Sequence, residues 1–240
     1  MAMPAKPVAN SASQPLINIK LPRITPKRRA RAEKLLAALH AHYPNAICEL
    51  NYTTPHELLI ATILSAQTTD VAVNKVTPAL FKAFPTPAAF AAAMPDQIEP
   101  YIKSIGLFRN KAKAVHAAMT TLMQDFKGQV PQTMDELLTL RGVARKTANV
   151  VLGNAFNINA GFVVDTHIDR LSKRLALAPK DATIAAVEQW LMAQFPQDQW
   201  CQVSHMLIWH GRRACKARMA CCCEHEICRE FGDACELGKK

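Results

Sequence analysis

Cysteine side chains crowd one end of this 240-residue sequence. Six of the eight cysteines lie in the last 26 residues. The eight are Cys48, Cys201, Cys215, Cys221, Cys222, Cys223, Cys228 and Cys235. A disulfide framework would spread its cysteines through a small secreted domain, whereas clustered thiols in a reducing compartment bind metal ions as thiolates. The sequence therefore predicts a metal site near the C-terminus.

A second stretch that could do chemistry is the turn 141–143, which precedes a helix expected to begin near Ala144. Gly142 lets the backbone turn and lets another molecule approach it closely. The first N–H groups of the following helix, at its positive dipole end, would receive a phosphate oxygen. A glycine between two helices is also an ordinary connection, so it is the adjacent Arg145 and Lys146 that favour a grip on a nucleic-acid backbone.

The net charge also favours a nucleic-acid partner. Lysine and arginine number 29 against 19 aspartate and glutamate residues, a formal net charge of +10. Such an excess suits a polyanion, nucleic acid before an anionic membrane surface, although it can also serve solubility alone. No apolar run approaches the roughly 20 residues of a membrane-spanning helix, and no apolar signal segment is expected. With 50% apolar residues, the chain can form a packed core.

Helix-start signals position these residues. The run 54–57 combines an N-cap threonine, a proline at the first helical position and a glutamate at the third. The segments 86–87 and 133–136 repeat parts of this pattern. Gly128 is expected to end a helix that runs to about Phe126. These signals predict a mainly helical chain.

Little else in the sequence competes with the helical pattern. Residues 161–164 form one short strand-like run, and residues 1–25, rich in Pro, Ala and Ser, are expected to be a disordered tail. The basic cluster 27–31 opens a helix and is interpreted as a solvated first turn, with a nuclear-localisation signal and a DNA-binding arm as the alternatives. The predicted fold class is all-α.

Five blocks resemble, in order, the motifs of the endonuclease III family of helix-hairpin-helix DNA glycosylases. They are 64–70 (LSAQTTD), 105–112 (IGLFRNKA), 140–148 (LRGVARKTA), 163–168 (VVDTHI) and 210–215 (HGRRAC). The third block departs at Arg141, where the family has proline, and at Ala144, where it has a second glycine. Arg141 adds a cation to the turn, and Ala144 is expected in helical backbone, which a helix start allows.

The resemblance implies a bifunctional DNA N-glycosylase and AP lyase of base excision repair. Lys146 would be its nucleophile, because an amine can displace the base and form a Schiff base with the opened sugar before β-elimination cuts the strand. Nearby cations and partial desolvation would lower the pKa of Lys146. Without the resemblance, Lys146 would be interpreted as one more phosphate contact.

Asp165 would be the carboxylate that faces the lysine, stabilises the cationic sugar and assists proton transfers. It also precedes a helix expected over 167–175, where aspartate is a preferred N-cap, and the two roles are compatible. Gln67 and Leu107 occupy the positions that fill the hole left by a flipped base. Their alternatives are a polar helix terminus and a core leucine. The resemblance adds five DNA contacts in the turn: Arg141, Gly142, Val143, Ala144 and Arg145.

The family holds a four-iron four-sulfur cluster through the pattern C-x6-C-x2-C-x5-C, which this sequence does not match throughout. The expected ligands are Cys215, Cys222, Cys228 and Cys235. The alternatives for the fourth are Cys221, Cys223 and, remotely, His225. Zinc is the second choice of metal, and a degenerate site without metal is the remaining one. Three histidines lack ligand-like spacing and are expected to be structural: His167, His205 and His210.

As a whole, the resemblance predicts a two-lobed all-α glycosylase fold with a C-terminal iron–sulfur cluster loop. One lobe is expected over 49–159, the other combines 26–48 with 160–240, and DNA would lie in the groove between them. The expected substrate is double-stranded DNA with damaged bases, foremost oxidised pyrimidines, or abasic sites. The enzyme is expected to be a cytoplasmic monomer, nucleoid-associated in a bacterium, with no membrane partner. A monofunctional mismatch or uracil glycosylase and a non-catalytic, metal-stabilised DNA-binding module stay open as alternatives.

Overall fold

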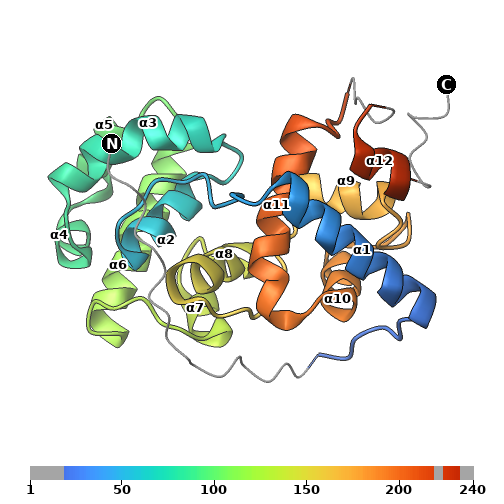
Figure 1. Cartoon of the computed structure of the whole chain (residues 1–240). Helices are drawn as coiled ribbons and strands as arrows, with labels where there is room; N and C mark the ends of the chain where they lie inside the picture. The colour runs from blue at the N-terminus through green and yellow to red at the C-terminus, as the bar shows by residue number, and fades with distance from the viewer. Residues whose placement is uncertain (1–18, 219–223, 233–240) are drawn as a thin grey trace. The chain divides into compact units, whose positions relative to one another are not determined.

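The structure is a computed structural model that describes residues 19–218 and 224–232 (Figure 1). Over these residues it contains α-helices, one short 3-10 helix and no strand, which confirms the all-α prediction. The strand-like residues 161–164 form an extended, buried segment. None of the described helices has the length and apolar character that crossing a membrane requires. The chain divides into two compact units.

The first unit comprises, among the described residues, Cys48–Ile158. Its helices are α2 (Pro55–Leu64), α3 (Asp70–Ala83), α4 (Pro87–Ala92), α5 (Pro95–Ile102), α6 (Phe108–Asp125), α7 (Met134–Thr139) and α8 (Arg145–Phe156). Three predicted helix starts are confirmed, because Thr54, Thr86 and Thr133 each accept a hydrogen bond from a backbone N–H three residues on. A cap of this kind stabilises a helix by about 1 kcal/mol.

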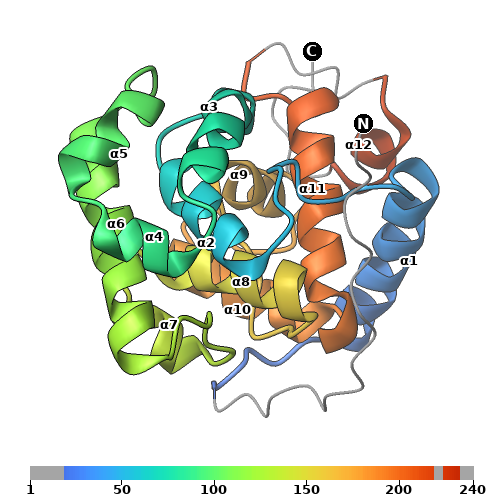
Figure 2. The same ribbon diagram turned by 90° about the vertical axis from the view of Figure 1, so that its left-hand side faces the viewer.

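Helix α2 forms the centre of this unit. Its residues from Leu58 to Leu64 are all buried, and the helix packs against α3, α6 and α8. Helix α6 runs along α4 and α5, which is clearest in the turned view (Figure 2). Helix α8, which carries Lys146, packs against α2 on one side and contacts α7. The hairpin formed by α7 and α8 therefore stands on a packed base.

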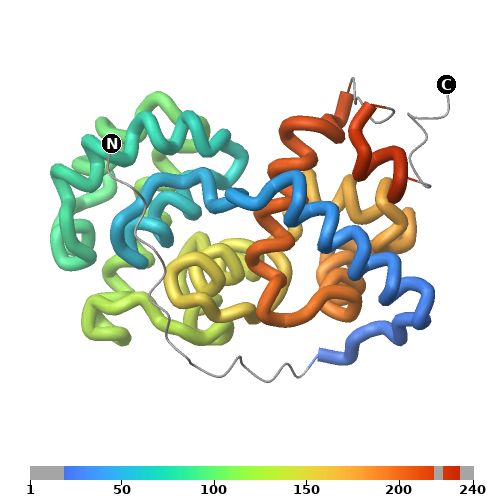
Figure 3. Tube along the Cα trace, viewed as in Figure 1, coloured from blue at the N-terminus to red at the C-terminus, as the bar shows by residue number. Residues whose placement is uncertain are grey.

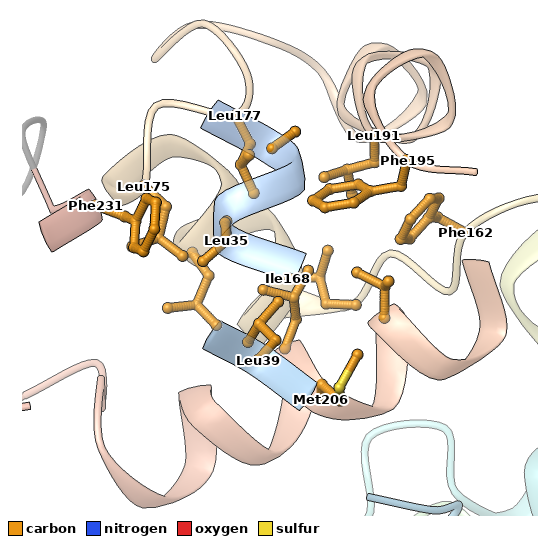
Figure 4. Packing of buried hydrophobic residues seen from close by; sticks show 14 of the residues in the cluster. Leu35, Leu39, Phe162, Ile168, Leu175, Leu177, Leu191, Phe195, Met206 and Phe231 are labelled. Carbon is orange, nitrogen blue, oxygen red and sulfur yellow. The ribbon is translucent and has the colours of Figure 1, made fainter. Parts of the chain in front are cut away.

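The second unit comprises, among the described residues, 19–47, 159–218 and 224–232. Its helices are α1 (Pro26–His42), α9 (Thr166–Arg174), α10 (Ile184–Gln194), the 3-10 helix η1 (Gln197–Gln199), α11 (Trp200–Arg213) and α12 (Glu226–Phe231). The apolar faces of the five α-helices that the structure describes in this unit meet in one core, where Leu35, Ile168 and Leu191 are fully buried (Figure 4). Burying one such side chain stabilises a fold by about 1.5–3 kcal/mol.

Segments far apart in the sequence lie side by side in the second unit. Helix α1 packs against α11 and α12, as the chain trace shows (Figure 3). The guanidinium of Arg31 donates hydrogen bonds to the carbonyl oxygens of Leu175 and Phe231, both at 2.7 Å. Arg31 therefore joins the C-terminal ends of α9 and α12 to α1, and the solvated interpretation of the basic cluster is wrong for this residue.

The predicted tail is too long. Ile19 and Leu21 pack against the core of the second unit, and Thr25 caps α1. The prediction of disorder is therefore wrong for 19–25, while 1–18 lie outside the described residues.

The predicted end of the helix near Phe126 is confirmed, but the turn after it is longer than predicted. Helix α6 ends with Phe126 as its C-cap. The left-handed turn that follows begins at Lys127, with φ 54°, and continues through Gly128, with φ 77°. The sequence prediction assigned this turn to the glycine alone, because glycine is the residue that adopts positive φ without strain.

Candidate functional site

The turn between α7 and α8 is closed by a hydrogen bond from the Val143 N–H to the Leu140 carbonyl oxygen, at 3.1 Å. Gly142 has a φ of 84°. A Cβ at this position would lie 3.1 Å from the Ala114 Cβ and 3.5 Å from the Ile63 Cγ2. Glycine is required here both by the backbone and by the space beneath it.

The start of α8 has no capping side chain. Its N-cap, Ala144, has φ −100° and ψ 170°, so the expectation of helical backbone at this residue is wrong. Extended backbone is equally open to alanine, and the departure from the family's glycine therefore causes no strain. Because a methyl group accepts no hydrogen bond, this helix end suits an anion that approaches from outside.

The other turn residues differ in what they can offer. The side chains of Arg141 and Lys146 are exposed, and Arg145 is half-buried. Val143 is 8% exposed, so its side chain belongs to the core and only its backbone is available to a ligand. Lys146 is thus open to an approaching ligand.

Gln67 and Leu107 share an unusual backbone. Their φ angles are 53° and 58°, a left-handed region that residues other than glycine rarely adopt. Gln67 lies in the turn between α2 and α3, and Leu107 is the N-cap of α6. Both side chains are exposed, Leu107 by 56%. A core position for this leucine, the alternative raised by the sequence, is therefore excluded.

Lys111 links the turns of Gln67 and Leu107 from inside the first unit. Its ammonium donates a hydrogen bond to the Thr68 Oγ1 at 2.5 Å, and its backbone N–H donates to the Leu107 carbonyl oxygen at 3.0 Å. The lysine is only 5% exposed, and burial lowers its pKa. Lys111 is not among the predicted site residues, and its place in the 105–112 block is the sequence signal that points to it.

Asp165 is the N-cap of α9, as predicted. Its Oδ1 accepts hydrogen bonds from the backbone N–H groups of His167 and Ile168, both at 2.8 Å. The half-buried carboxylate uses one oxygen for the cap, which leaves Oδ2 for a second role. Burial, together with the nearby Arg170, lowers the pKa of His167, while the negative charge of Asp165 acts in the opposite direction.

The other end of α9 is joined to the segment that follows α11. Arg170 donates to the carbonyl oxygens of Gly211 and Cys215, at 3.1 and 3.0 Å. Arg174 donates to the Cys215 Sγ at 3.2 Å and to the Lys216 carbonyl oxygen at 2.8 Å. One helix thus carries Asp165 at its start and contacts a predicted metal ligand at its end.

Three buried side chains could hold a metal ion in the described part of the chain. The ligand atoms of His210, Cys215 and Cys228 lie within 4.8 Å of one another. The structure therefore brings together two of the predicted ligands. The others, Cys222 and Cys235, and the alternatives Cys221 and Cys223 lie outside the described residues.

Histidine is the unexpected member of this group. The spacing in the sequence gave no reason to include His210, which stands at the head of the HGRRAC block five residues before Cys215. His225, a remote candidate ligand, is instead engaged elsewhere: its Nε2 lies 3.1 Å from the Tyr43 hydroxyl, and its Nδ1 accepts from the Ile227 N–H at 3.3 Å.

Comparison with known proteins identifies the family of this chain. A family model described as HhH-GPD superfamily base excision DNA repair protein matches residues 60–197. The endonuclease III of Synechocystis sp. is 50% identical over 200 residues, which cover 83% of this chain and 91% of that relative.

Two solved structures are similar over most of the chain. One is a non-covalent endonuclease III–DNA complex, with 39% identity, a TM-score of 0.82 and coverage of 90% of this chain and 98% of that chain. The other is a trapped endonuclease III–DNA covalent intermediate, with 40% identity, a TM-score of 0.80 and coverage of 85% and 94%. By this family match and these identities, the chain belongs to the HhH-GPD superfamily of base excision DNA repair proteins and, within it, to the endonuclease III family of DNA glycosylases with AP lyase activity.

Proposed function

We propose that this chain removes damaged bases, oxidised pyrimidines foremost, from double-stranded DNA and cleaves the strand 3′ to the resulting abasic site. The observation that carries the proposal is the exposed Lys146 in the first turn of α8, directly after the glycine turn and on an uncapped helix start. Such an end binds a DNA phosphate, which places the amine beside the deoxyribose.

Lys146 would act as the nucleophile at C1′ of the damaged nucleotide. Its nitrogen lone pair forms the new bond as the glycosidic bond breaks, and the base leaves with the bonding electrons and takes up a proton. Opening of the sugar gives a Schiff base, which acidifies the C2′ proton. Loss of that proton expels the 3′ phosphate by β-elimination, and water then releases the lysine. The trapped covalent intermediate of the related endonuclease III supports this assignment.

Asp165 would stabilise the cationic sugar in the transition state and assist the proton transfers. The support is its geometry: Oδ1 is fixed by two backbone N–H groups, so the orientation of the carboxylate is set before DNA binds. Preorganised charge of this kind costs little reorganisation during the reaction.

Gln67 and Leu107 would fill the space that the extruded nucleotide leaves. Their exposed side chains stand on strained turns tied together by Lys111. An amide can pair with the orphaned base, and an apolar wedge can enter the stack. Arg141, Arg145 and the backbone of 142–144 would hold the phosphates on either side.

The C-terminal thiols would hold a four-iron four-sulfur cluster, with zinc as the second choice. The described residues fit such a group, because the buried Cys215 and Cys228 converge and the first accepts a hydrogen bond from Arg174. Cys222 and Cys235 would complete the set. When bound, the cluster would cross-link the end of α11 to α12 and thereby support a basic loop beside DNA. We further propose that the enzyme works as a monomer in the cytoplasm, on the nucleoid of a bacterial cell.

Borohydride trapping tests the function. The wild-type chain is incubated with a duplex that contains an abasic site and, separately, with duplexes carrying an oxidised pyrimidine or uracil. We expect a covalent adduct that disappears in Lys146→Gln and persists in Lys75→Gln, a control at another exposed lysine of the same unit. Base release without an adduct would favour the monofunctional glycosylase, and DNA binding without either reaction would favour the binding module.

A further inference from the structure

Three aromatic side chains form a hydrogen-bonded row that ends at Cys228. The His225 Nε2 lies 3.1 Å from the Tyr43 hydroxyl, and that hydroxyl lies 2.9 Å from the His210 Nδ1. The His210 Nε2 in turn lies 3.2 Å from the Cys228 Sγ. The row connects α1, α11 and α12, whose residues come together only in the folded second unit.

The backbone fixes the direction of the first hydrogen bond in this row, and the sulfur at the other end decides the rest. The Ile227 N–H donates to the His225 Nδ1 at 3.3 Å, so this nitrogen carries no proton. The proton of His225 must then be on Nε2, which donates to the Tyr43 oxygen. The Tyr43 hydroxyl could donate to the His210 Nδ1 or accept from it, and the Cys228 thiolate, which only accepts, selects donation by Tyr43. The remaining proton of His210 therefore stands on Nε2 and points at the sulfur.

We propose that His210 is a hydrogen-bond donor to the Cys228 thiolate and not a metal ligand, and that Tyr43 and His225 hold its proton on Nε2. The inference rests on the proposed metal centre. A nitrogen that carries a proton has no lone pair for a metal ion, although its distance from the two sulfurs would otherwise suit one. His210 is thus a positioning residue of that centre.

Burial gives the donor its strength. His210 is 0% and Cys228 6% exposed, so water does not compete for the sulfur, and a hydrogen bond to a thiolate is strong in such surroundings. Cys215 has a corresponding partner in the Arg174 guanidinium, at 3.2 Å. Each of the two predicted metal ligands that the structure describes therefore has its own donor. Residues that support metal ligands in this way typically contribute about 10- to 100-fold to metal affinity.

The test compares His210→Leu, His210→Gln and Tyr43→Phe with the wild-type chain. Iron, sulfide and zinc are measured per chain, together with the thiolate-to-metal absorption band and the rate of metal release to an excess of chelator. Tyr52→Phe is the matched control, since its hydroxyl donates to the Asn154 carbonyl oxygen in the first unit.

We expect all variants to assemble the centre with the wild-type metal content. His210→Leu should shift the absorption band and release metal about 10- to 100-fold faster. The band position and the release rate of His210→Gln should lie between those of the wild type and of His210→Leu, because the glutamine amide N–H can replace the imidazole donor. Tyr43→Phe should change both readouts in the same direction by a smaller factor, and Tyr52→Phe should change neither.

Two results would overturn the inference. Equal loss of metal from His210→Leu and His210→Gln would identify His210 as a ligand. Unchanged band and release rate in all three variants would remove His210 from the centre. A wild-type chain without metal would contradict both the proposed metal centre and this inference. The borohydride trapping experiment would still test the lyase activity independently.

Discussion

Asp165 combines two roles at the scale of a single residue. One carboxylate oxygen caps α9 and the other is left for chemistry. Asparagine caps a helix about as well as aspartate, whereas alanine costs about 1 kcal/mol. Asp165→Asn should therefore unfold at nearly the wild-type urea midpoint, and Asp165→Ala should lose about 1 kcal/mol. Both should lose roughly 100-fold or more of the base-release rate. An asparagine variant with full activity would reduce Asp165 to a cap.

His205 should make the free energy of unfolding depend on pH. Burial lowers its pKa from the ordinary 6.5 to about 4. Since the folded chain resists the proton and the unfolded chain accepts it, the stabilisation is complete above pH 6.5 and is lost as the pH falls toward 4. The loss from this residue amounts to at most roughly 3 kcal/mol.

The measurement is urea unfolding at pH 7.5 and at pH 5 for the wild-type chain and for His205→Gln. We expect the wild type to lose more stability between the two values than the variant, because glutamine does not titrate. Equal losses would mean that the imidazole is protonated in the folded state or that its surroundings open to water.

At the scale of elements, the hairpin between α7 and α8 depends on one glycine. Gly142→Ala places a side chain in left-handed backbone, at a cost of about 1–2 kcal/mol, and brings a Cβ to 3.1 Å from Ala114. We expect lower thermal stability and weaker binding to a duplex with an uncleavable abasic-site analogue. Gly106→Ala is the stability control, because a Cβ there meets nothing within 4 Å. Equal stability of the two variants would contradict the steric argument.

At the scale of the whole molecule, the net charge of +10 should govern affinity for DNA. Each neutralised phosphate lowers the slope of log K against log salt by about 0.9. The exposed Arg141, where the family has proline, is expected to make one such contact. Titrations of a labelled duplex at several salt concentrations should show that the affinity of Arg141→Gln depends less steeply on salt. The magnitude of its slope should be smaller by about one, regardless of DNA sequence. A slope equal to that of the Lys75→Gln control would show that Arg141 does not touch a phosphate.

The sequence determined the features that depend on near neighbours along the chain. Each of three threonines caps a helix by accepting a hydrogen bond from a backbone N–H only three residues further along the chain: Thr54, Thr86 and Thr133. Such a cap can therefore be predicted from the local sequence alone. The same holds for Asp165 as a cap and for the glycine in the hairpin. The predicted activity and the roles of Lys146, Gln67 and Leu107 came from the five family blocks, because these blocks combine particular residue types with a particular spacing.

Tertiary structure alone decided the contacts between distant segments. Lys111 and Thr68 are 43 positions apart, and Tyr43 reaches His210 across 167 positions. No local pattern encodes such pairs, because they exist only where the packing of several helices brings their side chains together and excludes water. For that reason His210 looked structural from its spacing, and only the fold places its Nε2 against the sulfur of Cys228.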